Sequence, residues 1–402
     1  MLTTLRGAMT TTEPQAYPFN HDEGLDLDPA YRKLREAPGM IRVQMPFGEP
    51  AWLAVRYEDA RLVLGDRRFS RAMAATRDEP RTYPAQRPSG ILGMDPPDHT
   101  RLRKLVATAF TVRRVEALRP RVREITAGLV DAMIAAGPPT DLVDAFALPL
   151  PVQVICEMLG VPVEDRDRFR VWSDAALSTS SLTAEEFMAN FFAMSEYMAG
   201  LIAERTAEPR DDLISALIAA REEDVERLSP DELVQLCNGI LIAGHETTAT
   251  QIPNFVHVLL AADRFAELGE HPDRIPGAVE ELLRFIPLGA GSAFPRYATE
   301  DIEVGGTLVR AGEPVLVAVG SANRDESRFP DPETLHFDRP QNSHMGFGHG
   351  AHHCLGAPLA RLELQEALRE LTARLPGLRV VGEPEWKTAM LVRGPRKMDV
   401  TW

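Results

Sequence analysis

Cys354 lies in a segment whose residue types favour a metal-bound thiolate. Residues 347–356 have the sequence FGHGAHHCLG, and a stretch with helical periodicity, APLARLELQEALRELTARL, follows them directly. A thiolate is favoured at a helix N-terminus because unpaired N–H groups and the positive end of the helix dipole face it. The glycines allow the backbone to pass close to a flat, bulky group. The simpler alternative is a buried structural cysteine with scattered histidines around it.

A second group of reactive side chains lies within an apolar run. The sequence SPDE at 229–232 is a capping box with proline at the first helical position, which predicts a helix that continues to about residue 262. Such a helix would be roughly 45 to 50 Å long. Near its middle stand Glu246, Thr247 and Thr248. An acid and an alcohol are costly to bury there unless they form hydrogen bonds, although threonine often bonds back to its own helix. The alternative is a helix turn exposed at a cleft.

Charged residues at helical spacing mark two further elements. His99 and Arg103 are four residues apart and therefore share one face of a helix, whose start is predicted near Pro97. A solvated helix face is the alternative explanation for this pair. Glu281 and Arg284 are three residues apart and can also pair on one face. Such a pair stabilises little when exposed and is costly to break when buried.

Three motifs, in this order along the chain, resemble those of the cytochrome P450 family. The pattern A-G-x-[DE]-T at 243–247 resembles the oxygen-activation helix, and E-x-x-R at 281–284, with Arg339 in FDRP, resembles the structural triad. The pattern F-G-x-G-x-H-x-C-x-G resembles the haem-binding signature and is formed by Phe347, Gly348, Gly350, His352, Cys354 and Gly356. The resemblance covers nearly the whole chain, from DPPDHTRLR to WKTAMLVRGP.

The resemblance implies a mainly α fold with small β-sheets, in which haem b lies between the long central helix and the cysteine loop. Cys354 would be the axial ligand of the iron, where a thiolate favours cleavage of the O–O bond. The other cofactor-binding residues that the family motifs imply are His99, Arg103, Ala243, Gly244, Arg296, Phe347, Gly348, His352 and Gly356. Glu281, Arg284 and Arg339 are assigned to the fold. A zinc site built from the same residue types competes with haem, but the segment lacks a second cysteine or a paired-ligand spacing.

The same resemblance implies a monooxygenase that hydroxylates or epoxidises an organic substrate. When O₂ is split and one oxygen atom leaves as water, two protons are consumed, and a hydroxyl donor backed by a carboxylate relay can supply them. Thr247 and Glu246 would take these roles. Thr248 is a further candidate, and Gly244 would leave room for O₂.

The implied electron donor is a ferredoxin fed by an NAD(P)H reductase. Three arginines are candidates for its docking patch: Arg113, Arg114 and Arg361. Two other functions remain open. A haem peroxygenase would use hydrogen peroxide directly and would not need the relay at Glu246 and Thr247. A non-catalytic haem sensor or carrier would keep Cys354 but consume no reduced cofactor.

Details such as IAGHETTATQ and FGHGAHHC resemble actinomycete enzymes that tailor polyketides or macrolides in antibiotic biosynthesis. We therefore expect a large, largely apolar natural product as the substrate, with cyclic peptides, terpenoids and steroids left open. A long loop at 71–93 and a region rich in Ala, Ser, Phe and Met at 171–198 are expected to cover it. The candidate contact residues are Leu241, Ile242, Ala243, Leu288, Ala293, Phe294, Met390 and Leu391.

Composition limits the remaining classes. The chain has 402 residues and a formal net charge of −15, from 44 basic and 59 acidic residues, which argues against a general nucleic-acid binder. Three cysteines are too few for a disulfide framework and indicate a reducing compartment. No apolar run has the length of a membrane span, and the N-terminus lacks the apolar region of a signal peptide. We expect a cytoplasmic monomer with a loosely ordered segment at 1–20 and one haem-thiolate domain at 21–402.

Overall fold

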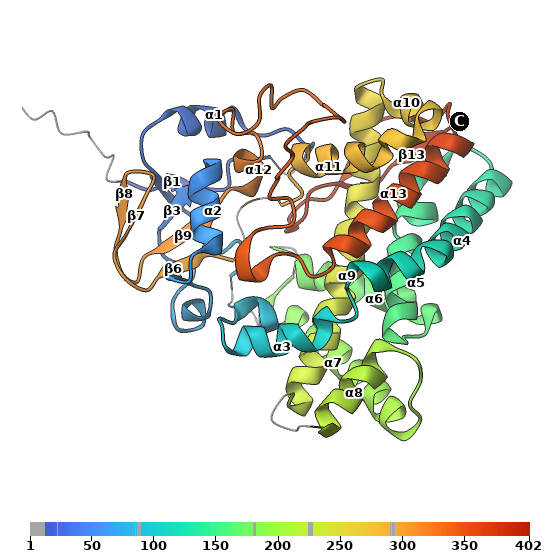
Figure 1. The fold of residues 1–402 in the computed structure, drawn as a ribbon, viewed down its shortest axis with the longest axis horizontal. Helices are drawn as coiled ribbons and strands as arrows, with labels where there is room; N and C mark the ends of the chain where they lie inside the picture. The colour runs from blue at the N-terminus through green and yellow to red at the C-terminus, as the bar shows by residue number, and fades with distance from the viewer. Residues whose placement is uncertain are drawn as a thin grey trace, which may run out of the picture.

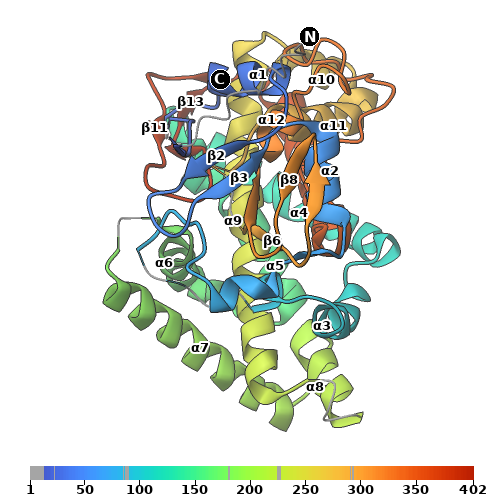
Figure 2. The same cartoon turned by 90° about the vertical axis from the view of Figure 1, so that its left-hand side faces the viewer.

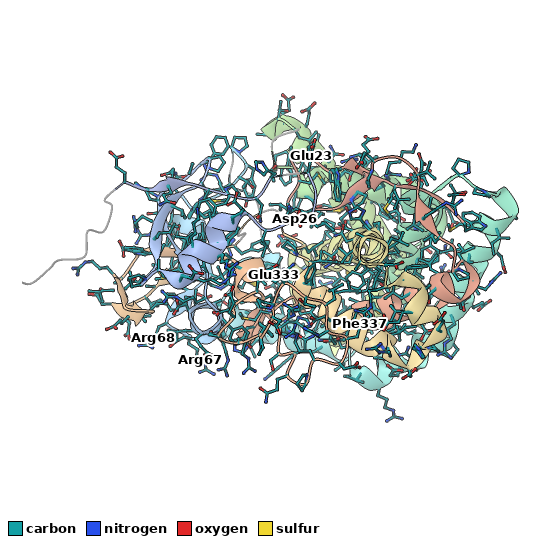
Figure 3. All side chains as sticks on the ribbon, turned by 90° about the horizontal axis from the view of Figure 1, so that it is seen from above. Glu23, Asp26, Arg67, Arg68, Glu333 and Phe337 are labelled. Carbon is teal, nitrogen blue, oxygen red and sulfur yellow. The ribbon has the colours of Figure 1, made fainter. Side chains whose placement is uncertain are left out.

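Helix α9 (Pro230–Ala261) runs through the centre of the molecule (Figure 1). Its start is fixed by the predicted capping box, because Ser229 Oγ accepts from the N–H of Glu232 and the Glu232 carboxylate accepts from the N–H of Ser229. Seen almost end-on, α9 is surrounded by side chains of other elements (Figure 3). Most of its residues are buried, as an apolar helix of this length requires.

The computed structural model describes residues 13–21, 23–84, 86, 90–179, 182–223, 228–289, 291 and 294–402. Their architecture confirms the predicted mainly α fold with small sheets. The expected loosely ordered segment at 1–20 falls partly outside this range, since residues 1–12 are not described. Its later part contains strand β1 (Gln15–Ala16) and the buried Tyr17.

The main helices pack around α9 and bury one large apolar core. Helix α13, which begins just after the cysteine loop, packs against both α4 and α9, and α5 also packs against α4 and α9. Helix α7 lies across the base of α9 (Figure 2). The helices of this part are α3 (Asp98–Ala107), α4 (Val112–Ala136), α5 (Pro149–Leu159), α6 (Arg166–Leu177), α7 (Ala184–Ala207), α8 (Leu213–Glu223) and α13 (Ala357–Arg374).

Shorter helices connect the core to the sheets. They are α1 (Pro29–Glu36), α2 (Tyr57–Gly65), α10 (Phe265–Glu270), α11 (Ile275–Phe285) and α12 (Val319–Ala322). Single turns of tighter or wider helix occur at η1 (Ala72–Thr76), η2 (Gly90–Gly93), η3 (Val143–Ala147), η4 (Val163–Asp165), η5 (Pro272–Arg274) and η6 (Gly350–His352). Within the described ranges, none of the helices is both long and apolar enough to cross a membrane.

The largest sheet has the strand order β1-β2-β3-β9-β6-β4 and lies on the opposite side of the molecule from α4 (Figure 1). The sequence predicts its central hairpin, because residues 41–45 alternate apolar and polar, PFGEP at 46–50 forms a turn, and residues 51–55 are apolar. The structure confirms it, with Ile41 paired to Leu53 in antiparallel register. Strand β9 pairs with β3 and β6. The preceding strands β7 and β8 pair with each other in a separate two-stranded sheet. These strands are β2 (Ile41–Gln44), β3 (Ala51–Ala54), β4 (Phe69–Ser70), β6 (Arg296–Ala298), β7 (Ile302–Val304), β8 (Thr307–Val309) and β9 (Pro314–Val317).

Two short apolar runs around RGP, between residues 386 and 402, predict one terminal hairpin, but the C-terminal segment contributes to two small sheets. Strands β11 (Glu385–Trp386) and β12 (Pro395–Lys397) pair with each other. The last strand, β13 (Asp399–Thr401), instead joins β10 (Arg379–Val380) and β5 (Thr140–Asp141). The loop between β11 and β12 therefore projects from a two-stranded base toward α9, where Gly394 packs against Thr250 and Asn254.

Candidate functional site

The loop that carries Cys354 is held in shape by its own backbone. The N–H of Cys354 donates to the carbonyl of Phe347 at 2.8 Å. Gly348 and Gly350 have φ values of 74° and 73°, which side chains rarely tolerate. A Cβ atom on Gly350 would also lie 2.3 Å from the carbonyl oxygen of Leu64 in α2. The glycines thus let the loop turn sharply and rest on α2 just before α13 begins.

The surroundings of the Cys354 sulfur combine burial with nearby donors. Burial raises the pKa of the thiol, while the N–H groups of Gly356 and Ala357 and the charges of Arg103 and Arg361 oppose this rise. These donors come from the start of α13, as the sequence predicted for a thiolate at a helix N-terminus. A cation bound to the sulfur would offset the remaining cost of burying the thiolate.

Four basic or imidazole side chains from three elements gather beside the cysteine loop. The rings of His99 and His352 lie 4.2 Å apart, and burial, with Arg296 nearby, lowers the pKa of His352 to about 3. Burial also lowers the pKa of Arg296 to about 10. Arg103 donates to the carbonyl of His353 at 2.6 Å. Placing the two arginines together with neutral imidazoles at such a site is costly without an anion. The carboxylates of a haem would supply that anion.

Helix α9 presents one gap in its otherwise buried central turns. Ala243 is exposed and Thr247 is partly exposed, whereas the intervening His245 and Glu246 are buried. Ala243 and Thr247 are four residues apart and therefore lie on one face. The hydroxyl of Thr247 donates to the carbonyl of Ala243 at 3.1 Å. This face has the small residue and the polar residue that a flat cofactor with a bound gas molecule would need.

Gly244 has a packing role in the structure that differs from the predicted one. Its missing Cβ would lie 2.7 Å from two side-chain carbons of Ile155 in α5. Gly244 therefore allows α5 and α9 to approach closely, and its missing side chain faces α5. The sequence predicted that Gly244 leaves room for O₂. The spacing of residues alone does not show which neighbouring element a glycine faces, so the contact with α5 could not be foreseen.

Glu246 forms a buried ion pair that the sequence analysis missed. Its Oε1 lies 2.5 Å from Nζ of Lys387, and Lys387 also donates to Oγ1 of Thr250 at 2.8 Å. Lys387 is 8% exposed, Glu246 3% and Thr250 0%. The available signal in the sequence was a charged residue, in WKTAMLV, three positions before the predicted contact residue Met390.

Glu363 on α13 is a second functional candidate that the sequence analysis missed. It is fully buried, and among the described residues its carboxylate forms no hydrogen bond of ordinary geometry, although the Thr248 hydroxyl acts on it as a weak donor. Burial raises its pKa to about 8, and Thr248 on α9 opposes only part of the rise. Thr248 is itself buried. An acid within a helical pattern carries no signal for such a position.

The predicted structural triad brings α11 next to the segment that precedes the cysteine loop. Glu281 and Arg284 are fully buried and joined by two hydrogen bonds of 2.7 and 2.9 Å. Arg339 Nε lies 3.0 Å from Oε2 of the same carboxylate. Arg284 also donates to the carbonyls of Asn323 and Pro332. The Oδ1 of Asn323 in turn accepts from the N–H of Met345, close to the loop.

The structure brings several candidate substrate residues to one place. The N–H of Leu391 donates to the carbonyl of Leu177 at the end of α6, and the N–H of Arg393 donates to the carbonyl of Leu288. Met390 and Ser178 form an isolated antiparallel β-bridge. Phe294 is 40% exposed.

The remaining candidate substrate residues differ in exposure. Ile242 is partly exposed on α9, whereas Leu241 is 1% exposed within the main core. Ala293 lies outside the described residues.

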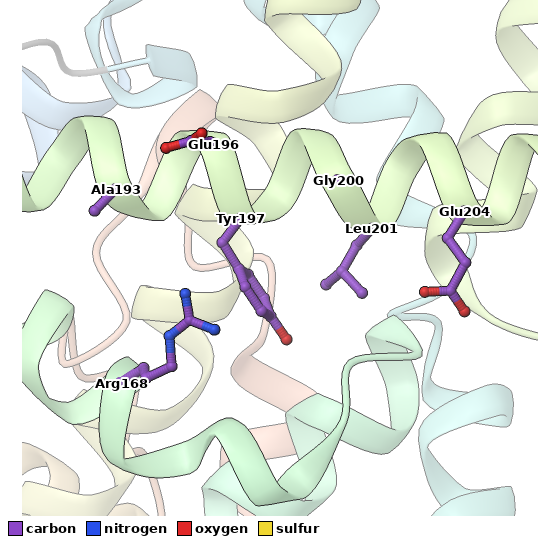
Figure 4. Close-up of a pocket in the computed structure, with 7 residues that line it drawn as sticks. All are labelled: Arg168, Ala193, Glu196, Tyr197, Gly200, Leu201 and Glu204. Carbon is purple, nitrogen blue, oxygen red and sulfur yellow. The ribbon is translucent and has the colours of Figure 1, made fainter.

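An open hollow of about 390 Å³ lies between α6 and α7, partly inside the region 171–198 that is expected to cover the substrate. Figure 4 shows Tyr197 and Leu201 pointing from α7 toward α6, with Arg168 across from them. None of its lining residues belongs to the predicted site. We therefore do not assign it to the substrate.

Of the three arginines proposed as a docking patch, Arg361 is already engaged. Its Nε lies 2.6 Å from Oε1 of Glu280, and its guanidinium lies over the ring of Phe347. Arg113 and Arg114 are exposed at the start of α4.

Comparisons with known proteins agree with this geometry. The family model described as Cytochrome P450 matches residues 275–375. Mycinamicin IV hydroxylase/epoxidase of Micromonospora griseorubida is 54% identical, and the alignment covers 98% of this chain and 100% of that protein. The chain belongs to the cytochrome P450 family. Nocardicin C N-oxygenase of Nocardia uniformis subsp. tsuyamanensis is 52% identical over 98% of this chain and 100% of that protein.

The fold comparison gives the same result for this P450. The crystal structure of HinD with NMFT and NO superimposes with a TM-score of 0.94 at 48% identity, covering 98% of this chain and 100% of HinD. The enzyme is therefore a P450 monooxygenase, and its cofactor is haem. Family membership decides between the haem and zinc hypotheses, and the partly buried Cys354, the basic cluster and the gap on α9 fit a haem.

Proposed function

We propose that this P450 hydroxylates or epoxidises a large, apolar natural product of the polyketide or macrolide type in antibiotic biosynthesis. The observation that supports this most strongly is 54% identity along essentially the whole length of mycinamicin IV hydroxylase/epoxidase. The apolar residues gathered near the end of α6 and the β11–β12 loop agree with an apolar substrate. Cyclic peptides, terpenoids and steroids are the competing substrate classes.

In this proposal Cys354 ligates the iron of haem b, which supplies O₂ binding and redox chemistry when present. His99, Arg103, Arg296 and His352 hold the propionates. Phe347, Gly348 and Gly356 would line the haem on the cysteine side and Ala243 would line it on the α9 side, where Gly244 acts through the close packing of α9 against α5. The triad of Glu281, Arg284 and Arg339 supports the fold of this region.

Proton delivery is assigned to α9. One turnover combines a substrate C–H bond, O₂, two electrons and two protons to give a C–OH group and one water, so the two protons must reach the site from solvent. Thr247 orients the last donor at the partly exposed face, and Glu246 is the acid of the relay. Thr248 is the further candidate, next to Glu363.

The electrons are proposed to come from NAD(P)H through a reductase and a ferredoxin. Arg113 and Arg114 are exposed and available to an acidic ferredoxin, whereas Arg361 must first leave Glu280. We propose a monomer that works in the cytoplasm, as one domain over 21–402, in agreement with three unpaired cysteines.

Two measurements test the proposal. The reduced carbonyl complex should show a thiolate-type Soret shift that Cys354→Ser abolishes, and an unshifted band in the unaltered enzyme would exclude the ligand assignment. A spin-state titration should then favour a macrolide of the mycinamicin type over a nocardicin. Stronger binding of the nocardicin would overturn the substrate class. Fast peroxide-supported turnover that Thr247→Ala leaves unchanged would instead favour a peroxygenase.

A further inference from the structure

Lys387 lies in the loop between β11 and β12, and this loop contacts both α9 and the candidate substrate residues. Its backbone N–H donates to the carbonyl of Gly394 at 2.9 Å across the base of the loop. A Cβ on Gly394 would lie 2.5 Å from Cγ2 of Thr250, so the loop rests directly on α9. Asn254 Nδ2 donates to the carbonyl of Arg393 at 2.9 Å and fixes the same contact.

The tip of this loop is attached to a different helix. The N–H of Thr179 donates to the carbonyl of Ala389 at 2.7 Å, and the N–H of Leu391 donates to the carbonyl of Leu177 at 2.8 Å. Ala389 has a φ of 54°, a conformation that costs free energy in a residue other than glycine and persists only where the surroundings hold it. The loop is thus held by the end of α6 at its tip and by α9 at its base.

The side chain of Lys387 determines where the Glu246 carboxylate points. The ammonium bridges Glu246 and Thr250, which are four residues apart on one face of α9. The adjacent Thr247 points to another face and donates to Ala243. The acid and the alcohol of the proposed relay are therefore held apart in this structure, and the acid is held by the loop.

We propose that Lys387 is a positioning residue that orients Glu246 for proton delivery and links this carboxylate to the loop whose tip contacts the substrate. This inference rests on the proposed role of Glu246. A buried carboxylate without its cation is strongly disfavoured, so loss of the ammonium moves Glu246 away from its place in the relay. The candidate substrate residues at the loop tip keep their backbone hydrogen bonds to the end of α6.

The test compares Lys387→Met with Lys387→Arg, which keeps the charge, in the haem-loaded enzyme supplied with ferredoxin, reductase and NAD(P)H. The macrolide used for the spin-state titration is the substrate. Loss of a general acid costs about 10²- to 10⁴-fold in rate, and we expect Lys387→Met to lose about tenfold in kcat because it acts through Glu246. A larger share of the electrons should end in hydrogen peroxide. The substrate dissociation constant should stay within threefold, and Lys387→Arg should recover most of the product yield.

A readout independent of turnover uses the unfolding midpoint of the same enzymes. As a single substitution, Glu246→Gln should lower the unfolding midpoint, because it leaves the buried Lys387 unpaired. In the Lys387→Met background the same change should raise it, because it removes an unpaired buried carboxylate. Lys397→Met is the matched control, since Lys397 lies in β12 with a half-exposed side chain paired to Asp399. Its kcat and peroxide share should equal those of the unaltered enzyme.

The outcomes distinguish the positioning role of Lys387 from the relay role of Glu246. If Glu246→Gln is impaired while Lys387→Met keeps kcat and product yield within twofold, the positioning role of Lys387 is overturned and the relay stands. If Glu246→Gln itself turns over normally, the relay is wrong and the positioning role is overturned with it. Lys387→Gln is measured in parallel, so that a failure of Lys387→Met to take up haem does not decide the result.

Discussion

The hydroxyl of Ser173 on α6 lies 3.0 Å from Nε2 of His245 on α9, and both residues are buried. Nδ1 of the same ring lies 2.7 Å from the carbonyl of Leu241, so Nδ1 carries the hydrogen and Nε2 accepts from Ser173. Burial lowers the pKa of His245, which keeps the ring neutral in this arrangement. This contact joins the helix expected to cover the substrate to the helix that carries Glu246 and Thr247.

Ser173→Ala should lower the free energy of unfolding by about 1–3 kcal/mol, because it leaves a buried ring nitrogen without a donor. The measurement is denaturant unfolding of the haem-loaded enzyme. Thr206→Ala on the exposed side of α7 is the control, and it should change stability much less. Equal effects of the two substitutions would show that the ring does not need its partner.

Gly244→Ala should destabilise the protein, because its Cβ would lie 2.7 Å from Ile155. Overpacking of this kind costs about 1–3 kcal/mol, against a gain in helix propensity of about 1 kcal/mol. Gly239→Ala on the same helix meets no atom within 4 Å and should stabilise the protein instead. Thermal unfolding of both variants checks the difference in sign. Ile155→Val should cost less in the Gly244→Ala background than alone.

Glu363→Gln should remove a pH dependence of stability. Burial raises the pKa of Glu363 to about 8 from an ordinary value of 4.5. Between these values the folded protein keeps a proton that the unfolded chain has lost, so this group makes stability fall as the pH rises. The difference in unfolding free energy, variant minus unaltered enzyme, should therefore increase with pH by up to about 1.4 kcal/mol per unit. If the difference in unfolding free energy between the variant and the unaltered enzyme were the same at pH 5.5, 7 and 8, this prediction would be contradicted.

Arg284→Met should be among the most damaging single changes outside the haem site. It leaves the fully buried Glu281 carboxylate with Arg339 as its remaining cation, and breaking a buried pair costs about 3–5 kcal/mol. We expect loss of haem retention together with stability, because the same network fixes the segment before the cysteine loop. The exposed pair of Arg374 and Asp131 offers a control whose disruption should have little effect.

Local signals in the sequence were sufficient for the elements that carry the site. The capping box at Ser229 predicted the start of α9, and the apolar run predicted its length to within a residue. The β2–β3 hairpin followed from alternation, and α3 from Pro97. These features depend on contacts between residues close in the chain, so the sequence displays them directly. The prediction of the C-terminal hairpin was less accurate because β13 leaves β12 and pairs with β10 and with β5, which lies far away in the chain.

The motifs also predicted, from the sequence alone, a haem-ligating role for Cys354, and they placed Glu246 and Thr247 on the central helix, where the structure has them. Only the tertiary structure decided what surrounds them. Lys387 is 141 residues from Glu246 in the chain, and Ser173 is 72 residues from His245. Nothing in the helical pattern of α13 distinguishes Glu363 from the partly exposed Glu370, yet Glu363 is fully buried. Burial and long-range pairing set the charge and orientation of these groups, and the spacing of residues along the chain does not encode either one.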